Sequence, residues 1–125
     1  MKQYVISLAL LIAALVAFPP SHANAQSQPE MNRQAAKDFE KADAELNAVY
    51  KKVLSGLDAE GKKKFQASQR AWIAYRDAEA AFQADGERGG SMAPLVYSTT
   101  ESELTGARIK ALQKQLSSDQ PATKK

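Results

Sequence analysis

Apolar side chains recur at a helical spacing in the first half of this chain, and this pattern constrains the fold more than any other feature. Between Ala35 and Leu57 they follow one another at intervals of three or four residues, and charged residues fill many of the positions between. Such spacing is typical of a helix with one buried face. The pattern predicts a helix from Glu30 to about Ser55, which ends at Gly56 because glycine is common just beyond a helix terminus.

A second helix is predicted from Asp58, whose carboxylate can cap the first turn, to about Ala84. It contains the only tryptophan of the chain, Trp72. The bulky side of this helix consists of Phe65, Ser68, Trp72, Tyr75, Glu79 and Phe82, and the opposite side of Ala67, Ala71, Ala74, Ala78 and Ala81. A helix with a bulky face and an alanine face suits a central position, with a partner packed against each.

Residues 85–91 break the helical pattern with three glycines, and a third helix follows. We expect Ser91 to cap this helix, with Pro94 in its first turn. The expected inward face is made of Tyr97, Thr100, Leu104, Ala107 and Ala111, with Arg108 beside it. Gly106 costs about 1 kcal/mol relative to alanine inside a helix, which predicts a close helix contact there.

Both ends of the chain differ from the helical part. Lys2, an apolar run over residues 5–18 and the small-x-small sequence at 23–25 are typical of a cleaved signal peptide, with an uncleaved anchor as the alternative. The predicted organisation is a signal peptide (1–25), a polar leader (26–29), a helical domain (30–116) and a disordered tail (117–125). The fold class is all-α: an up-down-up bundle of three helices with an extended helical hairpin. The expected location is periplasmic or secreted, without a stable membrane anchor.

Composition narrows the possible functions. The chain has no cysteine, and its single histidine, His22, lies in the predicted signal peptide. Nucleophilic cysteine, serine–histidine and zinc chemistry are therefore not expected in the mature protein, so we predict no enzyme, no catalytic residues, no metal and no cofactor. The pairs Glu101 with Glu103 and Asp77 with Glu79 are two residues apart on a helix and do not face each other. A net charge of +3 gives no reason to expect nucleic acid.

Four fragments, in this order and spacing, carry a resemblance. They are Asp43-Ala-Glu-Leu46-Asn47-Ala-Val-Tyr50, Gln69-Arg70-Ala71-Trp72-Ile73-Ala-Tyr75-Arg76-Asp77, Gly89-Gly90-Ser91, and Thr105 with Arg108 and Leu112. Together they resemble the lysozyme inhibitor LprI-like family of small exported bacterial domains. The family pattern usually has two cysteines where this chain has Ala80 and Thr100. The resemblance implies that one disulfide between the second and third helices is lost.

The resemblance also implies a function: an exported binding protein that inhibits lysozyme in the bacterial envelope, without catalysis. The hypothetical partner-binding residues are Arg88, Gly89, Gly90 and Ser91. A protruding cationic loop would suit the lysozyme cleft, which contains two catalytic carboxylates. A tight interhelical turn with Ser91 as its cap remains the alternative for this loop.

The other motif residues are predicted to be structural: Asp43, Asn47, Tyr50, Gln69, Trp72, Arg76, Thr105 and Arg108. We expect Arg76 to pair with Glu79 or Asp43, and Asp77 to be solvated. Similarly, Arg108 is expected to pair with Glu101 or Glu103. The alternative function is a structural or interaction protein of the periplasm that makes no lysozyme contact. In that case the alanine face of the second helix would mediate helix–helix association or self-association.

Overall fold

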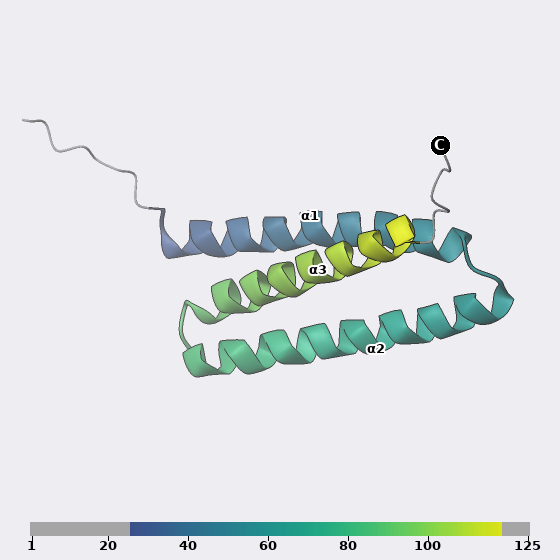
Figure 1. Ribbon diagram of the computed structural model, residues 1–125. Coiled ribbons are helices and arrows are strands. Elements are labelled where there is room, and N and C mark those ends of the chain that lie inside the picture. The colour runs from purple at the N-terminus through teal and green to yellow at the C-terminus, as the bar shows by residue number, and fades with distance from the viewer. Residues whose placement is uncertain (1–25, 119–125) are drawn as a thin grey trace, which may run out of the picture.

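The computed structural model describes residues 26–118, which form three long helices and one short 3-10 helix. The elements are α1 (Gln28–Ser55), α2 (Ala59–Ala84), η1 (Asp85–Glu87) and α3 (Ala93–Ser118), with no strand in this range. The predicted all-α fold is confirmed. Figure 1 shows the three helices side by side, with the α1–α2 connection at one end and the α2–α3 connection at the other. The predicted signal peptide and most of the predicted tail lie outside the described residues.

Local capping explains where the first two helices begin. α1 starts two residues before the predicted Glu30, because the Ser27 backbone N donates to Glu30 Oε2 at 2.8 Å and the Ser27 hydroxyl donates to the same oxygen at 3.0 Å. The predicted cap of α2 is confirmed: Asp58 Oδ1 accepts from the Gly61 backbone N at 2.7 Å. Neither these helices nor α3 is both long and apolar enough to cross a membrane.

The predicted cap of α3 is wrong. The helix begins at Ala93, so Met92 and not Ser91 occupies the position before it. The first helical hydrogen bond runs from Val96 N to Met92 O, at 3.0 Å. The backbone carbonyl of Ser91 instead accepts from Asn32 Nδ2 of α1 at 3.0 Å. This contact ties the loop to α1.

α3, and not α2, is the central helix. It lies between α1 and α2 in Figure 1 and packs against both. The inward face of α2 is also rotated from the predicted one, since its buried residues are Gln69, Arg76, Ala80 and Ala84. Tyr75 and Phe82 are 54% and 72% exposed. The prediction failed because it placed the bulky side chains of α2 in the interior. Instead, the small residues Ala80 and Ala84 let α3 approach, and the carboxylates of Asp43 and Asp77 compensate the charge of the buried Arg76.

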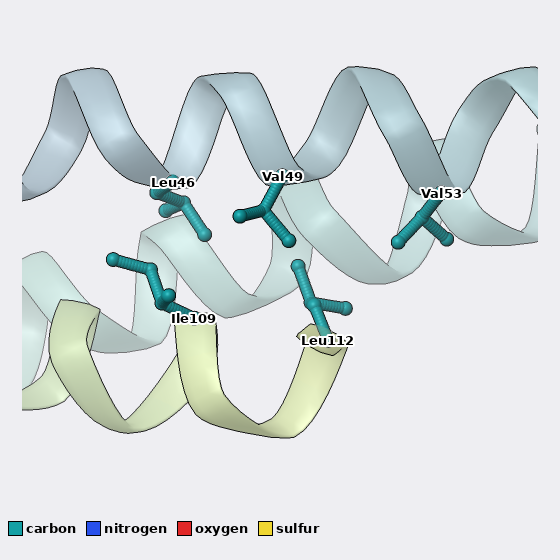
Figure 2. Close-up of a cluster of buried hydrophobic side chains, with 5 residues drawn as sticks. All are labelled: Leu46, Val49, Val53, Ile109 and Leu112. Carbon is teal, nitrogen blue, oxygen red and sulfur yellow. The ribbon is translucent and has the colours of Figure 1, made fainter. Parts of the chain in front are cut away.

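The apolar core joins α1 to α3 near their carboxyl-terminal halves. Figure 2 shows Leu46, Val49 and Val53 of α1 pointing toward Ile109 and Leu112 of α3. This part of the predicted seam on α1 is confirmed. Leu57, Phe65, Trp72 and Leu116 are partly buried and pack against the cluster. Trp72 and Phe65 are thus core residues, as predicted.

The inward face of α3 differs from the predicted one by about one residue. Its buried residues are Glu101, Thr105, Ile109 and Leu112, whereas the predicted Ala107 and Ala111 are exposed. The hydrophobic pattern predicted the wrong face because the polar residues Glu101 and Thr105 occupy two of the four buried positions. Gly106 makes no close helix contact either, since a Cβ built there would meet nothing within 4 Å.

Candidate functional site

Arg76 links α1 to α2 through a network of carboxylates. Its Nη1 donates to Asp43 Oδ1 at 3.0 Å and its Nε donates to Asp77 Oδ1 at 2.8 Å. The predicted pairing with Asp43 is present. Asp77 was expected to be solvated and is instead half-buried and paired. Glu79, the other predicted partner, accepts from Gln83 Nε2 at 2.7 Å.

Aromatic rings surround the buried end of Arg76. The guanidinium carbon lies 4.9 Å from the ring centroid of Phe39 and 5.4 Å from that of Trp72. Burial acts to lower the pKa of Arg76, but its hydrogen bonds and its proximity to Asp77 and Asp43 raise the pKa overall. The side chain therefore remains charged while it holds two helices together.

Two buried polar residues of α3 complete this region. Burial raises the pKa of the Glu101 carboxyl, and the negative charges of Asp77 and Asp43 raise it further against the opposing effect of Arg76. Thr105 is completely buried, and its hydroxyl has no hydrogen-bond partner among residues 26–118. These side chains belong to the packed interior and not to an accessible reactive site.

Arg108 of α3 also lies close to Trp72. Its Nε donates to Gln69 Oε1 at 3.2 Å, and its guanidinium carbon lies 5.7 Å from a Trp72 ring centroid. The predicted pairing with Glu101 or Glu103 is wrong, because Arg108 turns toward α2 and away from its own helix. Burial lowers the pKa of Arg108.

A groove of about 400 Å³ lies between α1 and α2. Its lining is Asp43, Leu46, Asn47, Tyr50, Gln66, Gln69, Arg70, Ile73 and Arg76. Five of the motif residues predicted to be structural therefore line one groove: Asp43, Asn47, Tyr50, Gln69 and Arg76. Sequence reasoning missed Gln66 and Arg70. The spacing of 43, 47 and 50 on one helix and 66, 69, 70, 73 and 76 on the next was the available signal, because each set lies on one side of its helix.

The other predicted site, Arg88 to Ser91, lies at the end of the bundle where α2 passes to α3 (Figure 1). All of residues 85–92 are exposed. Asp85 orients the Arg88 guanidinium: Nε donates to Oδ1 at 2.8 Å and Nη2 donates to Oδ2 at 2.7 Å. Gly89 has φ of 77°, a conformation that favours glycine. We call residues 85–92 the tip loop.

The chemistry of both regions is hydrogen bonding and ion pairing. Within residues 26–118, no group of three or more histidine, cysteine, aspartate or glutamate side chains could hold a metal ion. The tip loop presents an arginine that is paired with Asp85 and has the exposed Glu87 beside it, whereas the groove presents amides and a phenol beside the paired Arg76. These groups suit recognition of another polar surface.

Comparisons with known proteins agree with the fragments identified in the sequence. A family model described as "Lysozyme inhibitor LprI" matches residues 20–112. An uncharacterized protein of Rhizobium meliloti (strain 1021) is 34% identical, in an alignment that covers 79% of this chain and 81% of the relative. No solved structure matches the chain. The chain belongs to the lysozyme inhibitor LprI family.

Proposed function

We propose that this protein is exported to the bacterial envelope, where it binds lysozyme and inhibits it. The observation that carries the proposal is the family match over residues 20–112, which covers α1, α2, the tip loop and most of α3. Inhibition needs no reactive group on the inhibitor, only a surface that occupies or covers the cleft of the enzyme. The protein acts as a binding partner and not as an enzyme.

The tip loop is the proposed contact surface. It is exposed over its whole length. The hydrogen bond from Arg88 to Asp85 within the loop and the hydrogen bond from Asn32 of α1 to the Ser91 carbonyl hold the loop in one shape before binding. Preorganisation of this kind reduces the entropy lost on association. Asp85 accepts from Nε and Nη2 of Arg88, and Nη1 donates to no group among the described residues. An arginine has five N–H donors, so its Nη1 edge can donate to a carboxylate of the cleft.

Inhibition by loop variants tests the proposed contact. The protein, expressed from its complete gene, is titrated against lysozyme in a cell-wall lysis assay, and binding is measured by calorimetry. Arg88→Ala should weaken inhibition at least about tenfold, the effect of losing one charge-assisted hydrogen bond of about 1.5–3 kcal/mol. Ser91→Ala tests the hydroxyl alone, because it is the Ser91 carbonyl that binds Asn32.

Arg33→Ala is the matched control, since Arg33 is an exposed arginine on α1. It should leave inhibition unchanged, and all three variants should keep the thermal midpoint of the unmodified protein. Full inhibition by Arg88→Ala would exclude the tip loop as the contact. Equal losses in Arg88→Ala and Arg33→Ala would show a general charge effect. No inhibition by the unmodified chain would reject the proposed function itself.

A second candidate function is helix–helix association in the periplasm without any lysozyme contact. One specific observation favours it: the five alanines of the α2 alanine face, Ala67, Ala71, Ala74, Ala78 and Ala81, are all exposed. No other helix of residues 26–118 covers them, because α3 packs on the opposite side of α2. Loss of association on substitution of this face, with the fold intact, is the result that would support this function.

A further inference from the structure

The groove between α1 and α2 contains a buried amide that is held in one orientation. Gln69 lines the groove and is 7% exposed. The Nε of Arg108 donates to Gln69 Oε1 at 3.2 Å, so the oxygen of this amide faces Arg108 and its Nε2 lies on the other branch. Within residues 26–118 the Nε2 group donates to no acceptor. A donor that the protein orients in advance suits an acceptor that enters the groove.

Arg70 supplies a second free donor group and the unmatched charge of the groove. Its side chain is exposed, lines the groove and forms no hydrogen bond or ion pair within residues 26–118. No carboxylate lies three or four positions away from it on α2. The other charged residues that line the groove, Arg76 and Asp43, form with Asp77 a network of one net negative charge. Arg70 lies six residues before Arg76, about 9 Å along the helix, so an anion is attracted to the Arg70 end of the groove.

Amide and apolar side chains make up most of the remaining lining. Asn47 donates one hydrogen bond within α1 and keeps its amide oxygen as an acceptor, and Gln66 forms no hydrogen bond within residues 26–118. These amides offer donors and acceptors, as a peptide backbone does. Leu46 at the buried side and the partly exposed Ile73 add apolar surface. The combination matches a peptide better than a neutral sugar, which would leave Arg70 without a partner.

The length of the groove limits the size of its occupant. Its lining extends from Asp43 to Tyr50 on α1 and from Gln66 to Arg76 on α2, which is about 10 Å and about 15 Å along the two helices. An extended peptide advances about 3.3 Å per residue, so three or four residues fit. The volume of about 400 Å³ lies within the usual range of sites for small ligands.

We propose that this groove binds a short acidic peptide of three or four residues in an extended conformation. A carboxylate of the peptide pairs with the Arg70 guanidinium, and a backbone carbonyl accepts from Gln69 Nε2. The site is separate from the tip loop, which begins nine residues beyond Arg76 at the end of α2. The inference therefore goes beyond lysozyme inhibition and does not depend on it.

Nuclear magnetic resonance of the nitrogen-15-labelled full chain tests the site. The probe is a mixture of capped tripeptides with glutamate at the centre and alanine, leucine or tyrosine on either side, and the matched mixture has glutamine at the centre. The glutamate mixture should shift the side-chain signals of Gln69 Nε2 and Arg70 Nε until they saturate. The glutamine mixture should bind at least about tenfold more weakly, the effect of losing one charge-assisted hydrogen bond.

Substitution of Arg70 tests whether its guanidinium recognises the carboxylate. Arg70→Gln should weaken binding of the glutamate mixture about tenfold and leave binding of the glutamine mixture unchanged. Because Arg70 is exposed, the helical circular dichroism and the thermal midpoint should stay the same. The matched control is Arg33→Gln, at an exposed arginine of α1 outside the groove, which should bind both mixtures as the unmodified chain does.

Several results would overturn the proposal, and they differ in what replaces it. No shift of either side-chain signal up to millimolar peptide would exclude a peptide as the occupant. Equal binding of the two mixtures, or full binding by Arg70→Gln, would show that the groove does not recognise the carboxylate. Shifts produced by maltotriose and not by the peptides would make a neutral sugar the occupant. Loss of lysozyme inhibition in Arg70→Gln, with Arg88→Ala still inhibiting, would place lysozyme itself in the groove.

Discussion

Arg76→Met removes the charged link between α1 and α2 while it keeps an unbranched side chain in the same space. In the unmodified protein the guanidinium binds Asp43 of α1 and Asp77 of α2 and lies over Phe39 and Trp72. Methionine retains apolar contact with both rings but offers no hydrogen bond. The substitution therefore isolates the contribution of the charge.

The exposure of the three charged groups sets the magnitude. Removing one partner from a buried ion pair costs about 3–5 kcal/mol, and an exposed pair contributes about 0.2–1 kcal/mol. The Arg76 side chain is 8% exposed, but those of Asp43 and Asp77 are 40% and 45% exposed. Both carboxylates can therefore be rehydrated after the substitution. We expect a loss of about 2 kcal/mol in the free energy of unfolding, which lowers the thermal midpoint by about 8–16 °C in a domain of this size.

Urea denaturation of Arg76→Met, Asp43→Asn and the double variant measures this contribution as a double-mutant cycle. The sum of the losses in the two single variants should exceed the loss in the double variant by about 1 kcal/mol, since Asp43 no longer has a partner once Arg76 is absent. Arg33→Met, at an exposed position, should change stability by less than about 0.5 kcal/mol. A loss below about 0.5 kcal/mol in Arg76→Met, or additive single effects, would show that the Arg76–Asp43 pair does not stabilise the bundle.

Four further substitutions have definite expected outcomes. The pKa of Glu101 is raised in the folded protein, so the contribution of this carboxyl group to stability is present below the ordinary pKa of 4.5 and is lost as pH rises through the folded pKa. The thermal midpoint of Glu101→Gln should therefore equal that of the unmodified protein near pH 4 and exceed it near pH 7. Gly106→Ala should add about 0.5–1 kcal/mol in urea denaturation, since the added methyl group meets open space, and destabilisation would reveal a hidden contact. Leu46→Ala should lower the free energy of unfolding by about 3–5 kcal/mol, because Leu46 is buried. Phe82→Ser should lower it by less than about 0.5 kcal/mol in the monomer, because Phe82 is exposed and not buried as the predicted bulky face of α2 would require.

Periodicity predicted α1 well because its buried positions are apolar. Leu46, Val49 and Val53 are buried as expected, and the ends of α1 and α2 follow from capping and from glycine. These properties depend on a few neighbouring residues, which the sequence shows directly. Helix existence was predictable for the same reason.

The orientation of α2 and α3 was not predictable in the same way. Arg76, Glu101 and Thr105 are polar, so a hydrophobic pattern assigns them to the surface, although the structure buries all three. Of the three, Arg76 is compensated by Asp43 of α1, which lies 33 residues away in the chain and was one of its two expected partners. The Thr105 hydroxyl has no hydrogen-bond partner among residues 26–118. Pairwise compensation of this kind is a property of the assembled bundle and is not visible in the period of one helix.

The candidate sites divide in a similar way. The tip loop was recognisable from its glycines, but the pairing of Arg88 with Asp85 depends on the η1 turn between them. The α1–α2 groove brings together motif residues that were each interpreted as packing residues. Asn47, Tyr50 and Gln69 border one groove only because α1 and α2 lie side by side, which the pattern of either helix alone does not show.

A direct measurement of lysozyme binding is the sharpest test of the proposed function. Calorimetric titration of the chain into lysozyme, with cell-wall lysis measured on the same samples, should show saturable binding at one to one and a parallel loss of lysis. Both effects should weaken together in Arg88→Ala. Absence of binding at high micromolar concentration, with the helical fold intact, would contradict lysozyme inhibition and leave helix–helix association through α2 as the function to pursue.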